Sequence, residues 1–220
     1  MKKKLAALLA MSMLLTGALA GCGGSDEPAQ DDTAENTQSA TQDESAESTE
    51  TTGGTLRMGT NATFPPYETV DDNNNVVGID PDIAQAVADK LGMKLEIINM
   101  EFDSLIPALS ADQIDIAFAG MTVDPERAEQ VDFTISYATG IQAIIVPEDS
   151  TIASVDDLAD KKVGVQTGTT GDMYCTDDLG EDHVQRFESG VVATQALVNG
   201  QIDAVVIDNE PAKAYVEANQ

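Results

Sequence analysis

Short apolar segments alternate with helix-like segments from Thr55 onwards, and this alternation restricts the fold more than any other feature of the sequence. Strands are predicted at 56–59, 95–98 and 114–119, with helices between them at 80–91 and 105–109. The first helix has its apolar residues on one face, is expected to be capped by Asp80, and ends at Gly92. This βαβαβ order predicts a parallel sheet covered by helices on both faces.

A second set of alternating segments follows the apolar run 141–146, which is expected to form a strand that leaves the first sheet. Strands are predicted at 162–166, 184–187 and 202–207, and helices at 154–159, from about 170, at 191–199 and at 210–218. We therefore predict an α/β protein of two lobes joined by a crossover. Lobe 1 is expected at residues 55–143 and lobe 2 at residues 144–220.

The N-terminal region is expected to lie outside the fold. Residues 1–21 combine a basic start with an apolar stretch that ends in small residues, the layout of a signal peptide. The junction Leu19–Cys22 resembles a bacterial lipobox, which predicts lipidation of Cys22 and anchoring to the cell membrane by acyl chains. A plain signal peptide followed by an incidental cysteine is the alternative. Residues 22–54 are predicted to be a disordered acidic tether, because they are polar and contain no Lys or Arg.

Charge and cysteine content exclude some classes of protein. The formal net charge is −28 and the apolar share is 42%, which is enough for a globular core. Strong acidity argues against a nucleic-acid partner, whose phosphates require Lys and Arg. The chain has two cysteines, so disulfide bonds are not the main source of its stability.

Two loops resemble cofactor motifs but lack a required residue, so we predict no metal and no cofactor. Asp71–Asn75 resembles the start of a calcium loop, yet Val76 stands where such loops need glycine. Gln166–Gly171 is rich in Gly and Thr but lacks the spacing and the lysine of a phosphate loop. A helix that starts after such a loop still offers N–H groups to a carboxylate.

The stretch Ala119–Arg127 is predicted to run from a strand through a turn into a short helix. Asp124 suits the N-cap and Pro125 the first helical position. Arg127 then lies in the first turn, where the helix dipole disfavours a cation, so an anion is expected nearby. The sequence leaves two alternatives open: a surface ion pair with Glu126 or Asp132, or a small carboxylate ligand held by the guanidinium.

Several polar and aromatic residues follow predicted strands and are therefore expected at one edge of the sheet, since ligands of parallel sheets bind outside the carboxyl ends of the strands. In lobe 1 these residues are Asn61, Phe64, Phe102 and the stretch Ala119–Arg127. In lobe 2, Gln166–Gly171 and Asp208 hold equivalent positions.

Motifs distributed over residues 55–218 resemble, in this order, the family 3 solute-binding proteins of amino-acid ABC transporters. They are Leu56–Asn61, Phe64–Glu68, Gly78–Asp82, Phe102–Leu109, Ala119–Thr122 with Arg127, Gly164–Thr170 and Asp203–Asp208. The resemblance implies a two-lobe periplasmic-binding-protein-like (type II) fold with a ligand cleft between the lobes. It also implies an extracytoplasmic, monomeric protein that captures a free amino acid by hinge closure and delivers it to an ABC transporter permease.

The resemblance also implies roles for individual residues. Arg127 would hold the α-carboxylate of the ligand with help from Gly120, Met121, Thr122 and Thr170. Asp208 would accept the α-ammonium, although its position also fits a helix N-cap. Phe64 and Phe102 would enclose the ligand side chain, with core packing as the alternative for each. Asn61 and Gln166 would contact the polar end of that side chain.

Two departures from the family pattern modify these expectations. The chain ends at Gln220, just after a helix of lobe 2, whereas the family returns to lobe 1; we therefore expect the sequence to be a fragment. Asn61 stands where relatives that bind cationic or amide side chains often carry Asp. A polar or uncharged amino acid is therefore the expected ligand.

Two rival functions share this fold. A dehydratase-like periplasmic enzyme would need a poised acid or base, but His183 lies in an acidic loop and Cys175 has no orienting partner in the sequence pattern. We therefore predict that the protein is not an enzyme. A ligand-sensing domain of a membrane receptor would need a transmembrane helix beyond the domain.

Overall fold

The computed structural model describes residues 53–219. The predicted signal peptide, the lipidation site Cys22 and nearly all of the predicted tether lie outside the described residues. Among the helices of residues 53–219, none combines the length and the apolarity that a membrane crossing requires.

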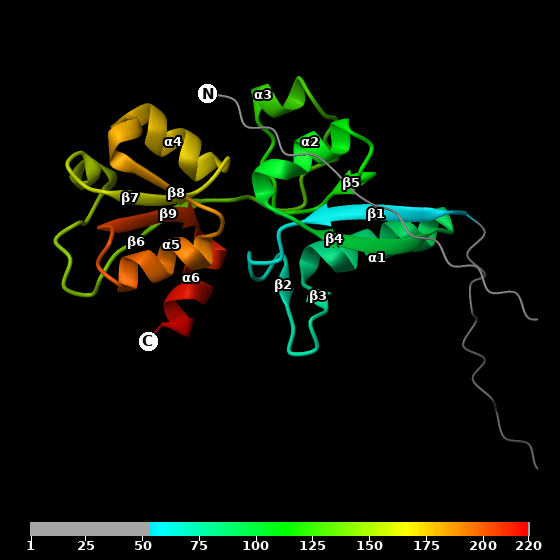
Figure 1. Cartoon of the computed structure of the whole chain (residues 1–220), viewed down its shortest axis with the longest axis horizontal. Coiled ribbons are helices and arrows are strands. Elements are labelled where there is room, and N and C mark those ends of the chain that lie inside the picture. Colours follow the sequence, from blue (N-terminus) through cyan, green and yellow to red (C-terminus); the bar gives the residue numbers. More distant parts are fainter. Residues whose placement is uncertain (1–52, 220) are drawn as a thin grey trace, which may run out of the picture. The chain divides into compact units, whose positions relative to one another are not determined.

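Lobe 1 is built on a parallel sheet with β1 (Thr55–Thr60) between β4 (Lys94–Asn99) and β5 (Ile116–Ala117). Helix α1 (Ile79–Leu91) covers one face, and α2 (Leu105–Ser110) covers the other (Figure 1). The remaining elements are the hairpin strands β2 (Thr69–Val70) and β3 (Val76–Val77), the short helix η1 (Phe102–Ser104) and α3 (Pro125–Ala128). The predicted βαβαβ order and the parallel sheet are confirmed.

The third strand of lobe 1 is shorter than the predicted range 114–119. Backbone hydrogen bonds from Asp115 and Phe118 to β1 flank the two residues of β5, so the contact with β1 extends beyond the strand itself. The chain then turns at Gly120, whose φ is 57°. The side chains of Ile114 and Ala119 are buried in the cluster around α2.

The prediction that Asp80 caps α1 is wrong. The N-cap is Gly78 and the helix begins at Ile79, so Asp80 lies inside the first turn. Gly78 has a φ of 138°, and a Cβ atom there would lie 2.3 Å from the Tyr67 carbonyl oxygen, so only glycine fits. The Asp80 side chain is fully buried, because it is turned towards the protein interior and not towards the helix N–H groups. The predicted C-terminal end at Gly92, in the left-handed conformation, is confirmed.

Lobe 2 contains a second sheet with the strand order β6 (Gln142–Ile145), β9 (Ala204–Asp208), β7 (Val163–Gln166) and β8 (Val184–Phe187). Strand β6 is antiparallel to β9, and the other neighbours are parallel. The boundary expected between residues 143 and 144 falls within β6. The helices are η2 (Val155–Leu158), α4 (Thr170–Leu179), η3 (Glu181–His183), α5 (Gly190–Val198) and α6 (Asn209–Ala218).

The alternation of side chains along β9 divides the core of lobe 2 into two layers. Val206 and Ala204 pack with α4 on one face, while Val205 and Ile207 pack with α5 and α6 on the other. Figure 1 shows α4 on one side of this sheet and α5 and α6 on the other. The elements predicted for this lobe are present within about two residues, an ordinary error at element ends. The helix expected at 154–159 is a single 3₁₀ turn, in which Ser154 and Asp157 form a capping box.

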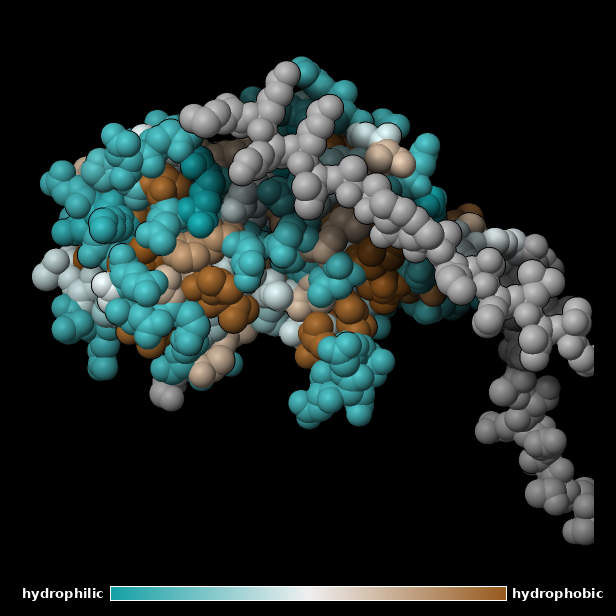
Figure 2. All heavy atoms as spheres, viewed as in Figure 1, coloured by the Kyte–Doolittle hydropathy of each residue, from teal (hydrophilic) through white to brown (hydrophobic). Residues whose placement is uncertain are grey.

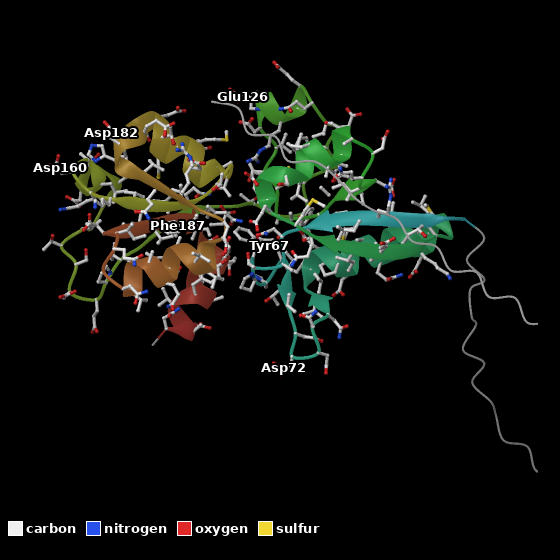
Figure 3. All side chains as sticks on the ribbon, in the orientation of Figure 1. Tyr67, Asp72, Glu126, Asp160, Asp182 and Phe187 are labelled. Atoms are coloured by element: carbon white, nitrogen blue, oxygen red, sulfur yellow. The ribbon has the colours of Figure 1, made fainter. Side chains whose placement is uncertain are left out.

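The surface of the described part carries its acidic residues on many elements. Hydrophilic residues dominate the face shown in Figure 2, and hydrophobic residues form separate patches there. Figure 3 labels four exposed carboxylates at the edges of the fold: Asp72, Glu126, Asp160 and Asp182. Exposed acidic residues therefore occur on several different elements of the described part.

Candidate ligand-binding site

Residues of both lobes line one cavity of about 20 Å³, close to the space that one water molecule needs. Its walls are Asn61, Phe64, Glu68, Phe102, Ala119, Gly120, Thr122, Arg127, Gln166, Thr169, Thr170 and Asp208. The structure thus brings together every predicted ligand-binding residue except Met121. Met121 packs against the cluster around Leu105 and Ile114 instead.

Arg127 is held in the cavity wall by contacts to backbone oxygens and to an aromatic ring. Asp124 accepts hydrogen bonds from the N–H groups of Glu126 and Arg127, which confirms the predicted N-cap. The guanidinium donates to the Thr122 carbonyl at 2.7 Å and, from lobe 2, to the Gly168 carbonyl at 2.8 Å. Its Cζ lies 5.5 Å from the centre of the Phe102 ring.

The alternative of a surface ion pair for Arg127 is wrong. Arg127 is only 7% exposed, and it forms no salt bridge with any carboxylate between residues 53 and 219. Burial lowers the pKa of its guanidinium from the ordinary value, although arginine remains charged in proteins. The cavity wall therefore contains a desolvated cation that forms no salt bridge within residues 53–219, although the Asp124 charge acts on it at longer range.

Asp208 lies at the end of β9, in the wall that lobe 2 contributes. The Gln142 side-chain amide donates to Asp208 Oδ1 and also to the Thr170 hydroxyl, the latter at 3.2 Å. Burial raises the pKa of the Asp208 carboxyl above its ordinary value, and the Gln142 hydrogen bond opposes this shift. Asp208 occupies the N-cap position of α6 as predicted, but its side chain makes no capping hydrogen bond. Asp208 is one of the residues that line the cavity.

The two predicted phenylalanines both reach the cavity but differ in their surroundings. Phe64 is buried and stacks on Tyr67 with ring centres 5.8 Å apart, in a cluster that includes residues of lobe 2. Core packing, which was the alternative for Phe64, is thus confirmed. Phe64 also lines the cavity. Phe102 is partly exposed, and its ring lies beneath the Arg127 guanidinium. Enclosure of a ligand side chain by both rings stays a prediction.

The amide side chains of Asn61 and Gln166 bond to each other across the lobes. Gln166 Nε2 donates to Asn61 Oδ1 at 3.0 Å and to the Glu188 carbonyl at 3.3 Å. Asn61 Nδ2 donates to the Met100 carbonyl at 2.8 Å.

Gly120 shapes the cavity more than it supplies hydrogen bonds to a carboxylate. Its N–H donates to Asp80 Oδ2 at 2.8 Å. This N–H is therefore engaged within the protein and is not free for the ligand carboxylate that the family resemblance implied. A Cβ atom at this position would lie 3.0 Å from the Phe64 ring. Glycine is therefore required both for the left-handed backbone and for the close approach of Phe64.

Glu68 is a cavity residue that sequence reasoning did not single out. It is fully buried, and both of its carboxyl oxygens lack a hydrogen-bond donor among the described residues. Burial and the nearby Asp80 carboxylate raise the pKa of Glu68 to about 10. The available signal was a glutamate that directly follows Tyr67 in a proline-containing loop at the carboxyl end of β1.

The two residues considered for an enzymatic role, Cys175 and His183, have separate surroundings in lobe 2. Cys175 is buried in the apolar layer beneath α4, and burial raises the pKa of its thiol to about 11, so the nucleophilic thiolate is disfavoured at neutral pH. His183 Nδ1 lies 3.3 Å from the Lys161 carbonyl oxygen, in η3 at the edge of lobe 2. Within residues 53–219 there is no cluster of His, Cys, Asp and Glu that fits a metal ion.

Two α/β lobes that each supply half of a cavity form a type II periplasmic-binding-protein-like fold, and solved structures with this fold match the chain. Residues 56–217 match the family of bacterial extracellular solute-binding proteins, family 3. Because this match covers most of the chain, the protein belongs to that family.

Similar proteins include amino-acid-binding proteins of ABC transporters. A probable histidine-binding protein of Neisseria gonorrhoeae is 36% identical over 222 residues, which cover 100% of this chain and 76% of the relative. A putative ABC transporter arginine-binding protein 2 of Escherichia coli is 38% identical over 169 residues, covering 77% of this chain and 69% of the relative. An ancestral arginine-binding protein bound to arginine has a solved structure with a TM-score of 0.72 and 47% identity, covering 76% of this chain and 75% of that one.

Proposed function

We propose that this protein is the extracytoplasmic binding protein of an amino-acid ABC transporter and that it binds a free α-amino acid between its lobes. The observation that carries the proposal is the pair of unlike charges in one cavity, Arg127 and Asp208, neither of which is neutralised by the other. An α-carboxylate satisfies the buried cation, and an α-ammonium satisfies the anion. A free amino acid carries both groups on one carbon atom.

Binding requires that the two lobes move apart and close again. A cavity of about 20 Å³ is too small for an amino acid, so its walls must separate before a ligand enters. The bonds from Arg127 to Gly168 and from Gln166 to Asn61 cross between the lobes and are the contacts that a ligand would replace. Ligand contacts with both walls then favour the closed form, which is a population shift of a hinge equilibrium.

We further propose that the ligand has a cationic side chain, with arginine as the first candidate. The expectation of a polar or uncharged ligand rested on Asn61, and the names of the similar proteins do not support it. Glu68 provides the physical argument, because it adds an acidic group to the cavity wall that is not paired with any Lys or Arg of residues 53–219. A guanidinium or ammonium group at the distal end of the ligand would supply that partner.

Delivery to a membrane permease and anchoring through Cys22 complete the proposal, with the protein acting as a monomer. The lipobox-like junction Leu19–Cys22 supports the anchor. The full chain expressed in a bacterial host should fractionate with membranes, whereas the Cys22→Ser variant should become soluble or remain as the uncleaved precursor. Equal membrane association and equal mass for both proteins would contradict lipidation.

A thermal-shift screen of the full chain against the twenty amino acids tests the proposed binding. A ligand that binds only the folded state raises its stability by RT ln(1 + [L]/Kd), which amounts to about 2.7 kcal/mol at a hundredfold excess over Kd. We expect the largest shift with arginine, a smaller one with glutamine and little with glutamate. No shift with any amino acid would contradict the proposed function, and a shift with glutamate alone would contradict the proposed side-chain class.

A further inference from the structure

Glu68 and Asp80 form a buried pair of carboxyl groups at the edge of the cavity. Both side chains have no exposed surface. Asp80 Oδ2 accepts hydrogen bonds from the Gly120 N–H at 2.8 Å and from the Tyr137 hydroxyl at 3.0 Å. Its other oxygen, Oδ1, and both oxygens of Glu68 have no donor among residues 53–219. These three unsatisfied atoms belong to two groups that contact each other.

A single proton provides partners for two of these three atoms and removes the repulsion between the two groups. Two ionised carboxylates can only accept hydrogen bonds, so as a doubly charged pair they would repel each other and leave buried oxygens without partners. A proton on Glu68 turns that side chain into a donor to Asp80 and removes one of the two charges. Asp80 is the member that stays ionised, because it alone receives donors from Gly120 and Tyr137. The raised pKa of Glu68 agrees with this assignment.

We propose that Glu68 and Asp80 share one proton and that a cationic ligand side chain expels it, so that the protein takes up such an amino acid in exchange for a proton. This inference rests on the proposed function. In the exchange, the Glu68 O–H bond breaks, the proton passes to solvent, and the Glu68 carboxylate accepts a hydrogen bond from the ligand cation. The total charge of the cavity then stays the same, which avoids burying an additional net charge. A ligand with a neutral side chain leaves the proton in place.

The groups around Glu68 come from several elements, and their effects can be assigned. They are Tyr67 in the same loop, Asp80 on α1, Tyr137 in the segment before β6, Arg127 on α3, Asp208 at the end of β9, and Tyr215 on α6. The Asp80 charge opposes ionisation of Glu68. The three tyrosines stay neutral, because burial raises the pKa of each phenol. Arg127 and Asp208 would be engaged by the α-carboxylate and α-ammonium of any amino acid. Only the ligand side chain therefore decides whether Glu68 loses or keeps its proton.

Calorimetric titration of the full chain near neutral pH, in two buffers with different ionisation enthalpies, measures the number of protons released on binding. Arginine and glutamine form the matched ligand pair, because they share their α-groups and differ in side-chain charge. We expect release approaching one proton for arginine and close to none for glutamine. The affinity for arginine should also rise with pH, by up to tenfold per pH unit, while that for glutamine stays constant.

The Glu68→Gln variant and an infrared measurement complete the test. The variant should bind arginine without releasing a proton and without the pH dependence. In the unmodified protein, the C=O stretch of a buried protonated carboxyl should disappear when arginine is added and persist with glutamine; this readout does not require the variant to fold. Arginine binding with no proton release, or equal release with both ligands, overturns the inference and leaves the proposed function intact. Failure of every amino acid to bind overturns both.

Discussion

Arg127 and Asp208 line the same cavity from opposite lobes, and each is held by uncharged groups of the protein. Arg127 bonds to the carbonyls of Thr122 and Gly168, and Asp208 accepts a bond from the Gln142 amide. Each charge is thus positioned without being neutralised. Its burial carries a desolvation free energy, which an oppositely charged ligand group can offset. A site with this arrangement selects for a ligand that carries an anion and a cation close together.

Replacement of Arg127 by alanine should abolish amino-acid binding and leave the stability of the ligand-free protein almost unchanged. The ligand loses charge-assisted hydrogen bonds to its carboxylate, which corresponds to a loss of affinity of about 100-fold or more. The folded state loses two bonds to carbonyls but no longer buries a cation, so the two effects on unfolding oppose each other. Calorimetry and thermal melting measure the two effects. A fall in Tm of more than about 4 °C would indicate a structural role instead.

The Asp208→Asn substitution should weaken binding of every amino acid by about 10- to 100-fold, because a neutral amide replaces the acceptor of the α-ammonium. Burial raises the pKa of Asp208, which means that the folded state disfavours the ionised form. The unfolding free energy of the variant at neutral pH should therefore be unchanged or higher. The exposed residue Asp182 offers a control: Asp182→Asn makes the same change in net charge and should leave affinity unaltered. Equal affinity of the Asp208 variant and this control would argue against the assigned role.

Gly120→Ala should reduce ligand affinity through the aromatic wall of the cavity. The added Cβ would lie 3.0 Å from the Phe64 ring, and the backbone at Gly120 has a φ of 57°. Gly200 is the matched control, because its φ is 68° and a Cβ atom added there would meet no other atom within 4 Å. Both alanine variants should lose about 1 kcal/mol of unfolding free energy from backbone strain. Only the Gly120 variant should also lose affinity, as binding isotherms of the two proteins would show.

Stability should fall as the pH rises from about 4.5 towards about 10, and Glu68 should be the main cause. In this range Glu68 is ionised in the unfolded chain and protonated in the folded one, so the folded state binds more protons. The unfolding free energy should then decrease with a slope that approaches about 1.4 kcal/mol per pH unit. Urea unfolding at several pH values in this window measures the slope for the protein and for Glu68→Gln. The same slope in both would assign the pH dependence to other groups.

The order of the secondary-structure elements was predictable, because hydrophobic periodicity and capping residues are local properties. The cap at Asp124 and the end of α1 at Gly92 follow from the residues themselves. The gathering of Asn61, Phe102 and Arg127 was also predictable, since the carboxyl ends of parallel strands meet at one edge of a sheet. The role of Asp80 was predicted wrongly, because an aspartate at the start of a helix has the same local sequence context whether it caps the helix or is buried in the core.

Local sequence patterns were enough to predict the two-lobe α/β architecture and most of the residues around the cavity, since both depend on a few neighbouring residues at a time. The pairing of those residues was set by tertiary packing. Folding directed the Gly120 N–H to Asp80, left Arg127 without a salt bridge among the described residues, and placed Glu68 against a second carboxylate. The physical reason is burial: the charge state and the hydrogen-bond partners of a side chain depend on groups that are distant in the sequence and that come together only when the chain folds.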